Sequence, residues 1–254
     1  MIDPTDPRSP SRQIADDLRE EIRDGGLAPG ARLPSERELV ERYGTSPQTA
    51  RQAVSLLKGE GLVVGMPGRG VFVRERPPVL RVGSDRYARW RRVQGKAPLQ
   101  AEVEELGLKW RQEVLALAEV PAPDWIATWY EVDPGAPLFV RRRRFWIDDN
   151  PSQLADSYYL LDLVKGTRIT EENTGPGGGY RVLEELGYPL TRVREEVAIR
   201  MPTPDEVRAL RLEPGTPVAE LHRVSFSGDK PIEVLQGILA GDRYVFCYDM
   251  PVND

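Results

Sequence analysis

The succession of local signals in residues 11–73 constrains the fold of this chain more than any other feature of it. The apolar residues Ile14, Leu18 and Ile22 recur at every fourth position, which predicts a helix with one buried face. The glycines at 25–26 end this helix. Two more helices and a hairpin are predicted directly after it, and few folds accommodate that order within about seventy residues.

Two capped helices follow. Ser35 and Glu38 have the spacing of a capping box, which predicts a second helix that starts at Ser35 and runs to about Tyr43. Ser46 is placed to cap a third helix, and Pro47 suits its first turn because the missing N–H would have no intrahelical partner there. Helices joined by such a short turn form a helix-turn-helix, whose second helix lies in the major groove of DNA.

A hairpin is predicted after the third helix. Strand-like runs at 62–64 and 71–73 bracket a glycine-rich turn that holds Arg69 at its tip. The three helices and this hairpin together predict an N-terminal winged helix-turn-helix.

This N-terminal stretch resembles the DNA-binding domain of the GntR family of transcriptional regulators. The matching motifs are Leu33-Pro34-Ser35-Glu36-Arg37-Glu38-Leu39, Glu60-Gly61-Leu62 and Gly68-Arg69-Gly70-Val71-Phe72-Val73. The resemblance implies DNA contacts from Arg37, Gln48, Thr49, Arg51, Gly68 and Arg69. The family usually has arginine where this chain has Pro47, so one contact is missing and the operator is expected to differ from the family's commonest half-site.

Each of these signals also has a structural interpretation. A Ser-x-x-Glu cap or a Gly-x-Gly hairpin on its own is more often structural than functional. Arg37 and Arg51 have an alternative role as surface salt-bridge partners of Glu36, Glu38 or Glu41. The combined order of the signals favours DNA binding.

The length of 254 residues favours two domains, because single hydrophobic cores usually stop growing at about 100–200 residues. Pro77-Pro78 marks a linker, since consecutive prolines hold the backbone extended. We predict a DNA-binding domain over residues 1–76 that starts with a loose arm over 1–12, a linker over 77–82 and a second domain over 83–254. Residues 1–76 carry 12 Lys+Arg and 12 Asp+Glu, so a DNA surface there must be a local basic patch.

An internal repeat organises the second domain. Asp133-Pro134-Gly135-Ala136-Pro137-Leu138 is matched by Glu213-Pro214-Gly215-Thr216-Pro217-Val218, and Arg143, Asp149 and Pro151 are matched by Arg223, Asp229 and Pro231. Each copy is predicted to form a helix, a Pro-Gly turn and two strands joined by a turn. Two copies are too few for a solenoid, so we expect one antiparallel sheet with helices to one side, an α+β fold with a site between the copies.

The second domain resembles the ligand-sensing UTRA domain of the HutC subfamily, whose fold is similar to that of chorismate lyase. The resemblance spans about residues 83–250 and is carried by Arg143, Asp156-Ser157-Tyr158-Tyr159, Gly177-Gly178-Gly179-Tyr180, Pro231-Ile232-Glu233 and Asp242-Arg243-Tyr244. In that family, small effectors such as phosphorylated sugars or organic acids lie between arginines, hydroxyls and a glutamate. The resemblance thus implies effector binding by Arg143, Ser157, Tyr159 and Glu233, with Arg141 and Arg86 as further candidates.

The four consecutive arginines 141–144 cannot form one patch, because alternate residues of a strand face opposite sides. One pair can face a pocket, where guanidinium groups suit a phosphate or carboxylate, and the other pair can face solvent or a partner. The alternative is a solvated strand face with Glu233 in a salt bridge. The glycines 177–179 could cradle an anion at a helix N-terminus, but a bare glycine run favours a flexible loop.

Composition argues against other classes of protein. The only cysteine, Cys247, and the only histidine, His222, provide no cluster of metal ligands and both look structural, so we expect neither an enzyme nor a cofactor. No apolar run approaches the roughly 20 residues that span a bilayer, and no signal-peptide pattern is present, so we expect a cytoplasmic protein.

The resulting prediction is a homodimeric DNA-binding repressor that a small anionic effector releases from its operator. Two alternatives stay open at this point. One is a dimeric repressor whose second domain senses nothing. The other, less favoured, is a carboxylate-based enzyme that uses the lyase-like fold.

Overall fold

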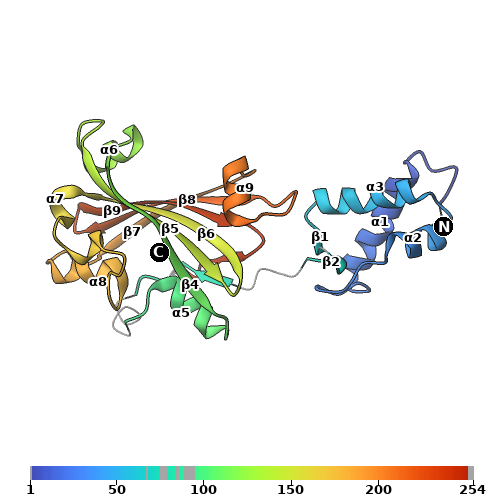
Figure 1. Cartoon of the computed structure of the whole chain (residues 1–254), viewed down its shortest axis with the longest axis horizontal. Helices are drawn as coiled ribbons and strands as arrows, with labels where there is room; N and C mark the ends of the chain where they lie inside the picture. The colour runs from blue at the N-terminus through green and yellow to red at the C-terminus, as the bar shows by residue number, and fades with distance from the viewer. Residues whose placement is uncertain (1, 67, 75–78, 84–85, 89–94, 251–254) are drawn as a thin grey trace. The chain divides into compact units, whose positions relative to one another are not determined.

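The computed structural model divides into two compact units (Figure 1). Residues 1–76 make up the bulk of one unit, and residues 77–211 and 217–254 form the other. The structure describes all residues except 1, 67, 75–78, 84–85, 89–94 and 251–254. Among the described helices, none is both long enough and apolar enough to cross a membrane.

Three helices and a hairpin form the first unit. They are α1 (Pro10–Arg23), α2 (Glu36–Tyr43), α3 (Pro47–Gly59), β1 (Val63–Met66) and β2 (Gly70–Val73). Ser35 and Glu38 form the reciprocal capping box at the start of α2. At the start of α3 the Ser46 side chain accepts the Thr49 N–H, and Pro47 is the first helical residue. The helix starts are therefore those that the local sequence predicts.

The core of this unit joins the three helices to the hairpin. Ile14 and Leu18 of α1 are fully buried, and they belong to one cluster with Leu39 of α2 and Leu57 of α3. Ile22 packs at the margin of the cluster. The stripe of apolar residues on the first helix is thus its buried face.

The N-terminal segment is more ordered than the loose arm that we expected up to residue 12. Helix α1 already begins at Pro10. The Gln13 side chain accepts the Asp3 N–H at 2.8 Å and donates to the carbonyls of Asp3 and Arg8, both at 3.0 Å. One glutamine amide therefore ties the segment to α1, which a composition argument does not detect.

A six-stranded antiparallel sheet, in the order β4-β5-β6-β9-β8-β7, dominates the second unit. Its strands are β4 (Trp110–Pro121), β5 (Pro137–Ile147), β6 (Asn150–Leu160), β7 (Arg192–Arg200), β8 (Val218–Ser227) and β9 (Lys230–Ala240). The helices are α5 (Pro98–Glu105), α6 (Asp124–Tyr130), α7 (Leu161–Val164), η1 (Arg168–Thr170), α8 (Gly178–Glu185) and α9 (Pro204–Leu210). The α+β class is confirmed.

The two sequence repeats are the two halves of this sheet. The segments α6-β5-β6 and α9-β8-β9 each form the predicted helix, turn and strand pair, and β6 pairs with β9 at the centre. The duplication is longer than we predicted, because α5 and β4 precede one copy and α8 and β7 precede the other. Glu104-Glu105-Leu106-Gly107 matches Glu184-Glu185-Leu186-Gly187 at an offset of 80 residues, which is also the offset between Arg143 and Arg223.

Helices cover both faces of the sheet, whereas we expected them on one side. Phe139 and Val140 are neighbours on β5 and are both buried, in clusters on opposite faces. Helices α7 and α8 pack with Phe139. Helix α6 packs with Val140, and the Tyr130 hydroxyl donates to the Tyr158 carbonyl at 2.7 Å. A strand that is apolar on both sides needs cover on both sides, and this explains the difference.

The predicted linker is too long. Residues 79–82 form strand β3 (Val79–Val82), which pairs in parallel with β10 (Tyr244–Cys247). Val79 is fully buried, and Arg81 forms a salt bridge with Glu195 at 2.5 Å. Pro77 and Pro78 lie outside the described residues. The pairing partner of β3 is near the far end of the chain, so no local signal distinguishes this strand from a linker.

Candidate functional site

The first candidate surface begins at the N-terminus of α3. Gln48 and Arg51 are exposed there, whereas Thr49 is half-buried and its hydroxyl lies 2.9 Å from that of Ser46. Arg51 Nε also lies 3.4 Å from the Pro47 carbonyl. Gln48 and Arg51 are thus exposed at the end of α3 from which a recognition helix reads base edges, while Thr49 also serves the cap.

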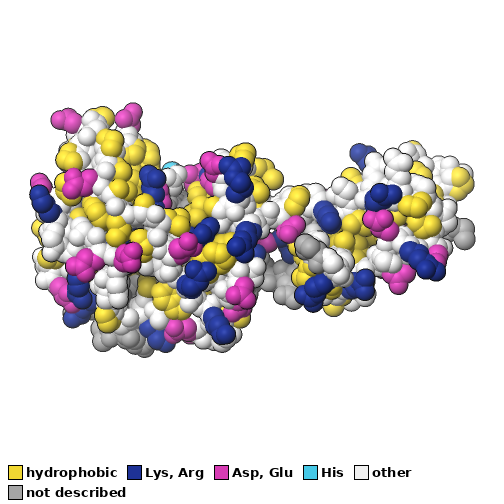
Figure 2. Space-filling view, viewed as in Figure 1, with side chains coloured by type: hydrophobic (Ala, Val, Ile, Leu, Met, Phe, Trp, Pro, Cys, Tyr) yellow, Lys and Arg dark blue, Asp and Glu magenta, His cyan; other side chains and the backbone are white. Residues whose placement is uncertain are grey.

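The arginines of α2 and α3 form weak surface salt bridges. Arg37, whose side chain is 89% exposed, lies 3.0 Å from Glu41, and Arg51, 63% exposed, lies 3.4 Å from Glu36. These are the contacts that the sequence left as an alternative role. Exposed pairs contribute only about 0–1 kcal/mol, so a DNA phosphate or base can replace the carboxylates. Figure 2 shows the same interspersion of basic and acidic side chains over the face in view.

The hairpin presents the other predicted DNA contacts. Gly68 and Arg69 are both exposed at the turn, where Met66 pairs with Gly70. Gly68 has φ +72°, and a Cβ built there would meet no atom within 4 Å. The Arg69 guanidinium lies 5.8 Å from the centre of the Phe72 ring. The turn thus offers an open backbone position at Gly68 and an exposed cation at Arg69.

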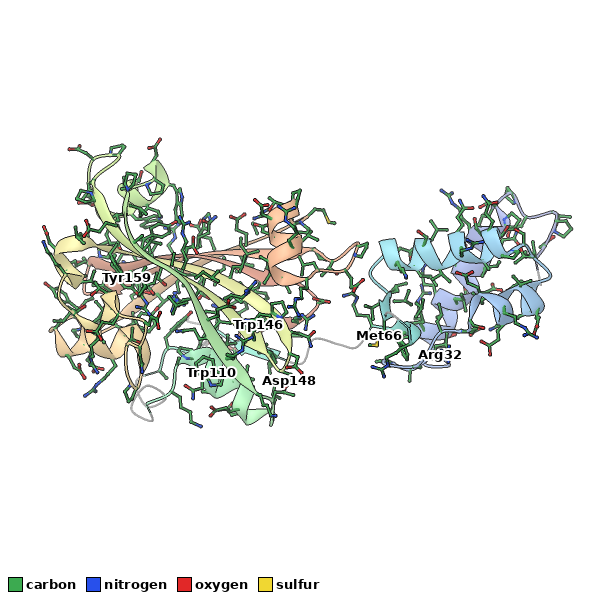
Figure 3. All side chains as sticks on the ribbon, viewed as in Figure 1. Arg32, Met66, Trp110, Trp146, Asp148 and Tyr159 are labelled. Atoms are coloured by element: carbon green, nitrogen blue, oxygen red, sulfur yellow. The ribbon has the colours of Figure 1, made fainter. Side chains whose placement is uncertain are left out.

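Sequence reasoning missed Arg32, which lies beside the hairpin (Figure 3). Arg32 is exposed and forms an isolated antiparallel bridge with Phe72. Its Nε would be 3.0 Å from a Cβ at Gly70, where φ is +119°. The segment before α2 and the hairpin are distant in sequence, so only the fold brings this second arginine to the turn.

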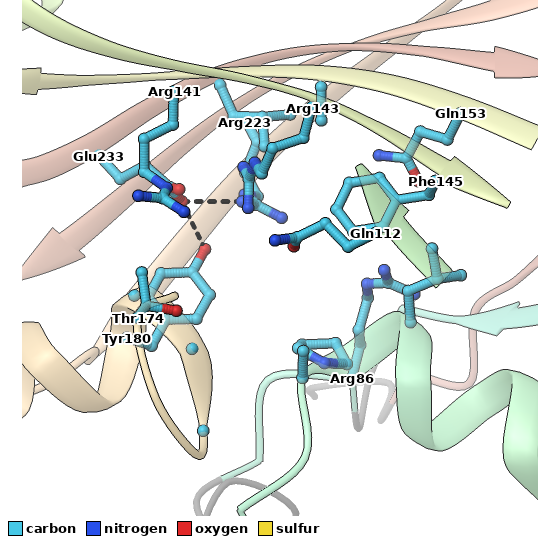
Figure 4. Close-up of a pocket in the computed structure, with 18 of the residues that line it drawn as sticks. Arg86, Gln112, Arg141, Arg143, Phe145, Gln153, Thr174, Tyr180, Arg223 and Glu233 are labelled. Carbon is cyan, nitrogen blue, oxygen red and sulfur yellow. Dashed lines mark hydrogen bonds and ion pairs between the residues drawn. The ribbon is translucent and has the colours of Figure 1, made fainter. Parts of the chain in front are cut away.

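The second candidate site is a pocket of about 100 Å³ in the second unit (Figure 4). Because one water needs about 10–15 Å³, the pocket admits a small ligand. It is lined by Arg86, Gln112, Arg141, Arg143, Phe145, Gln153, Ala155, Tyr159, Thr174, Tyr180, Arg223, Glu233 and Leu235, with residues 97–99 and 177–179. Five of the six predicted effector residues therefore share one cavity. The sixth, Ser157, is fully buried and accepts a hydrogen bond from Arg143.

The four arginines of β5 divide as the strand alternation predicts. Arg141 and Arg143 line the pocket. Arg142 faces the other side, is half-exposed and lies 3.3 Å from Asp156. Arg144 forms a salt bridge with Glu113 at 2.9 Å. Only one pair of the run is available to a ligand in the pocket.

The two pocket arginines of β5 lack a carboxylate partner among the described residues. Arg141 is buried and donates to the carbonyls of Ile169, Glu171 and Glu172. Burial lowers the pKa of its guanidinium. Arg143 donates to the Ser157 hydroxyl, and its Nε has no hydrogen-bond partner. These two side chains give the cavity an excess of positive charge.

Glu233 is the centre of a buried hydrogen-bond network. Its carboxylate accepts from Arg223 at 2.7 Å, from the Tyr180 hydroxyl at 2.8 Å and from the Tyr159 hydroxyl at 2.9 Å. Burial raises the pKa of Glu233, but the charges of Arg223 and Arg143 and the hydrogen bonds outweigh this and lower the pKa to about 2. Glu233 is therefore ionised and already paired within the protein.

Arg86 reaches the pocket from an irregular segment. It forms a fully buried salt bridge with Glu102 of α5. Burial disfavours its charge, but Glu102 outweighs this and raises the pKa of the guanidinium. Arg86 thus lines the cavity with its charge balanced by Glu102, unlike Arg141 and Arg143.

Two helix N-termini border the pocket. Residues 97–99 begin α5, and residues 177–179 begin α8, with Gly177 as its N-cap at φ +81°. The glycine run is therefore part of the pocket wall and not the flexible loop that we favoured. The first N–H groups of a helix have no intrahelical acceptor and carry a partial positive charge. Both ends favour an anion in the cavity.

Arg223, Tyr180, Gln112 and Gln153 were missed as site residues. A signal for Arg223 existed, because it matches Arg143 in the repeat. The residues considered for catalysis are elsewhere. His222 faces away from the pocket and stacks on Trp125, with ring centroids 4.5 Å apart, while Cys247 lies in β10.

Two family models match the chain. The model described as bacterial regulatory proteins, gntR family, matches residues 10–73, and the UTRA domain model matches residues 105–245. The chain belongs to the GntR family and carries a UTRA domain. This confirms the family that the sequence motifs predicted.

Individual relatives are similar in sequence or structure to nearly the whole chain. An uncharacterized HTH-type transcriptional regulator of Streptomyces coelicolor is 36% identical over 98% of this chain and 95% of its own length. The crystal structure of a GntR-family transcriptional regulator has a TM-score of 0.64 at 29% identity and covers 97% of this chain and 99% of its own. The histidine utilization repressor of Pseudomonas putida is 26% identical over 89% of this chain and 85% of its own length, which supports the HutC subfamily.

Proposed function

We propose that this GntR-family protein is a repressor that binds a two-fold symmetric DNA operator as a homodimer and is released by a small anionic effector. The observation that carries the effector proposal is the pair Arg141 and Arg143, which line the pocket and have no carboxylate partner among the described residues. The similarity to the histidine utilization repressor of Pseudomonas putida supports the repressing role.

The DNA-binding half of the proposal rests on the first unit. Arg37, Gln48, Arg51 and Arg69 are exposed, and Gly68 is open for close approach of a phosphate. One helix-turn-helix reads only a few base pairs, so two copies on paired half-sites supply the affinity and specificity that an operator requires.

The effector half rests on charge. Glu233 neutralises Arg223, and Glu102 neutralises Arg86, so the excess positive charge of the cavity belongs to Arg141 and Arg143. A buried uncompensated charge is costly, and an anion with one or two negative charges removes that cost. Phosphorylated sugars and organic acids are the corresponding ligand classes.

We favour a regulator over an enzyme because the protonation states of the pocket residues suit ligand binding and not acid-base catalysis. The Glu233 carboxylate is ionised by its partners, and Tyr159 keeps its proton because burial raises its pKa. Neither group is therefore tuned to exchange a proton near neutral pH, as a general acid or base must be. We accordingly propose no catalytic activity, and a cytoplasmic location where the operator is present.

The test is a thermal-shift screen of phosphorylated sugars and organic acids, followed by operator release. A ligand at about 100 times its dissociation constant adds roughly 2.7 kcal/mol of stability. Arg143→Ala should abolish the shift and the release while operator affinity stays within about threefold of wild type, because linkage acts only through bound effector. Arg142→Ala is the matched control, since Arg142 faces away from the pocket and should change neither.

Three results would contradict the proposal in different ways. If no anion stabilises the protein, the dimerisation-only repressor replaces the effector-responsive one. If Arg143→Ala prevents folding, Arg143 is structural. If Arg142→Ala loses the response equally, the cavity is not the site.

A further inference from the structure

The duplication pairs each pocket residue of one half with a residue of the other. Arg143 on β5 corresponds to Arg223 on β8, and Gln153 on β6 corresponds to Glu233 on β9. All four side chains line the same cavity. Both arginines leave their Nε without a hydrogen-bond partner. The two halves thus present equivalent arginines but different residues beside them.

The strand register repeats the equivalence. Phe145 is opposite Gln153 across β5 and β6, and the register shifts immediately after Phe145. Ser225 is opposite Glu233 across β8 and β9, and the register shifts immediately after Ser225. Positions 153 and 233 are therefore equivalent in backbone register, relative to the arginine of the neighbouring strand.

The two places differ in charge. In the second half, Arg223 donates to the Glu233 carboxylate at 2.7 Å. In the first half, the equivalent position holds the neutral amide of Gln153, and Arg143 donates to the hydroxyl of Ser157. Figure 4 shows Glu233 paired with Arg223, and Gln153, Phe145 and Gln112 around the other side of the cavity. At this pair of equivalent positions, one half carries a carboxylate and the other half carries an amide.

The N-terminal turns of α8 and α5 also differ in whether they contact Glu233. In α8, Tyr180 donates to Glu233 at 2.8 Å. The equivalent residue of α5 is Gln100, whose amide donates instead to Glu104 at 2.9 Å. Among the described residues that line the cavity, those at the start of α5 are Ala97, Pro98 and Leu99, so no carboxylate of that group meets the partial positive charge of the helix end.

We propose that the anionic group of the effector occupies, beside Arg143 and Gln153, the place that the Glu233 carboxylate occupies beside Arg223. The inference rests on the proposed effector function and adds the position of the anion and the residue that admits it. Gln153 is the specificity-determining residue, because its neutral amide leaves the Arg143 charge to the ligand and can donate an N–H to an oxyanion. A compact oxyanion, carboxylate or phosphate, fits this place.

The experiment measures binding of inorganic phosphate and of acetate to the full-length chain by calorimetry and by the shift in unfolding temperature. Gln153→Glu places a carboxylate beside Arg143 and should reduce the affinity for either anion by at least about 100-fold, given the strength of a charge pair at contact. The double variant Gln153→Glu/Glu233→Gln keeps the net charge of the wild type. Its affinity for the anion should return to within about tenfold of wild type. The reason is that the position without a carboxylate is then the one beside Arg223.

The outcomes separate the two proposals. If the wild type binds neither anion nor any member of the wider effector screen, the proposed function fails and this inference fails with it. If the wild type binds and folded Gln153→Glu binds equally well, only the position assigned to the anion is wrong. A folded double variant that does not regain anion affinity also overturns the assignment. The loss of affinity in Gln153→Glu would then not result from a carboxylate that occupies the position of the anion.

A crystal structure of the wild type with phosphate gives a second measurement that needs no variant. Phosphate between Arg143 and Gln153 supports the assignment. Phosphate bound to Arg223 with Glu233 displaced overturns it.

Discussion

The buried Glu233 network predicts a specific pH dependence of stability. Its carboxyl pKa falls from an ordinary value of 4.5 to about 2 in the folded protein. Each pKa unit corresponds to about 1.4 kcal/mol, so ionised Glu233 contributes about 3 kcal/mol to the free energy of unfolding above pH 5. Because the folded pKa is the lower one, this contribution is present above the unfolded pKa and is lost as pH falls toward 2.

Most of the loss falls in a measurable range. Between about pH 6 and about pH 3, the unfolded carboxyl takes up its proton while the folded one does not, and about 2 kcal/mol of the contribution disappears. Glu233→Gln has no carboxyl to titrate, so its free energy of unfolding should decline less steeply over this range by that amount. The variant should also be less stable at neutral pH, because Arg223 loses its buried partner.

Urea unfolding followed by tryptophan fluorescence is the assay. The chain's five tryptophans all lie beyond residue 76, so the signal reports on the second unit alone. Glu119→Gln is the matched control, because Glu119 is an exposed carboxylate of β4 outside the network. If wild type and Glu233→Gln lose stability in parallel from pH 6 to pH 3, the buried ion pair is not the source and the reasoning is refuted.

The remaining predictions concern DNA. Arg51→Ala should cost about 1–3 kcal/mol of operator binding and relax base preference, and equal losses on operator and random DNA would show a phosphate contact only. Arg69→Ala should weaken binding to all sequences and reduce the salt slope by about 1, which titrations at several salt concentrations test. The protein should sediment as a dimer and protect paired half-sites, so a monomer that protects an asymmetric site would exclude the dimer model.

Short-range chemistry made the first unit predictable from sequence. The capping residues Ser35, Glu38 and Ser46 act on N–H groups within three residues, so the helix starts follow from local sequence. The alternation of side chains along a strand likewise separates Arg141 and Arg143 from their neighbours without any knowledge of the fold.

The internal repeat carried most of the prediction for the second unit. Two copies of helix, turn and strand pair were visible from the Pro-Gly motifs, and the sheet that they form was expected from their pairing. The leading helix and strand of each copy were missed, although Glu104-Glu105-Leu106-Gly107 and Glu184-Glu185-Leu186-Gly187 match at the ends of the leading helices. The strands β4 and β7 that follow them are the two edges of the sheet and carry no motif of this kind.

The charge state of the cavity was decided only by tertiary structure. Glu233 is ionised because Arg223, Tyr180 and Tyr159 reach it from three different elements, and a carboxylate in a low-dielectric interior depends on every such partner. The sequence predicts Arg143 as an effector-binding residue, and the repeat makes Arg223 its equivalent. Only the folded sheet shows that Arg223 pairs with a carboxylate while Arg143 donates to a hydroxyl, because that difference depends on residues brought together across strands.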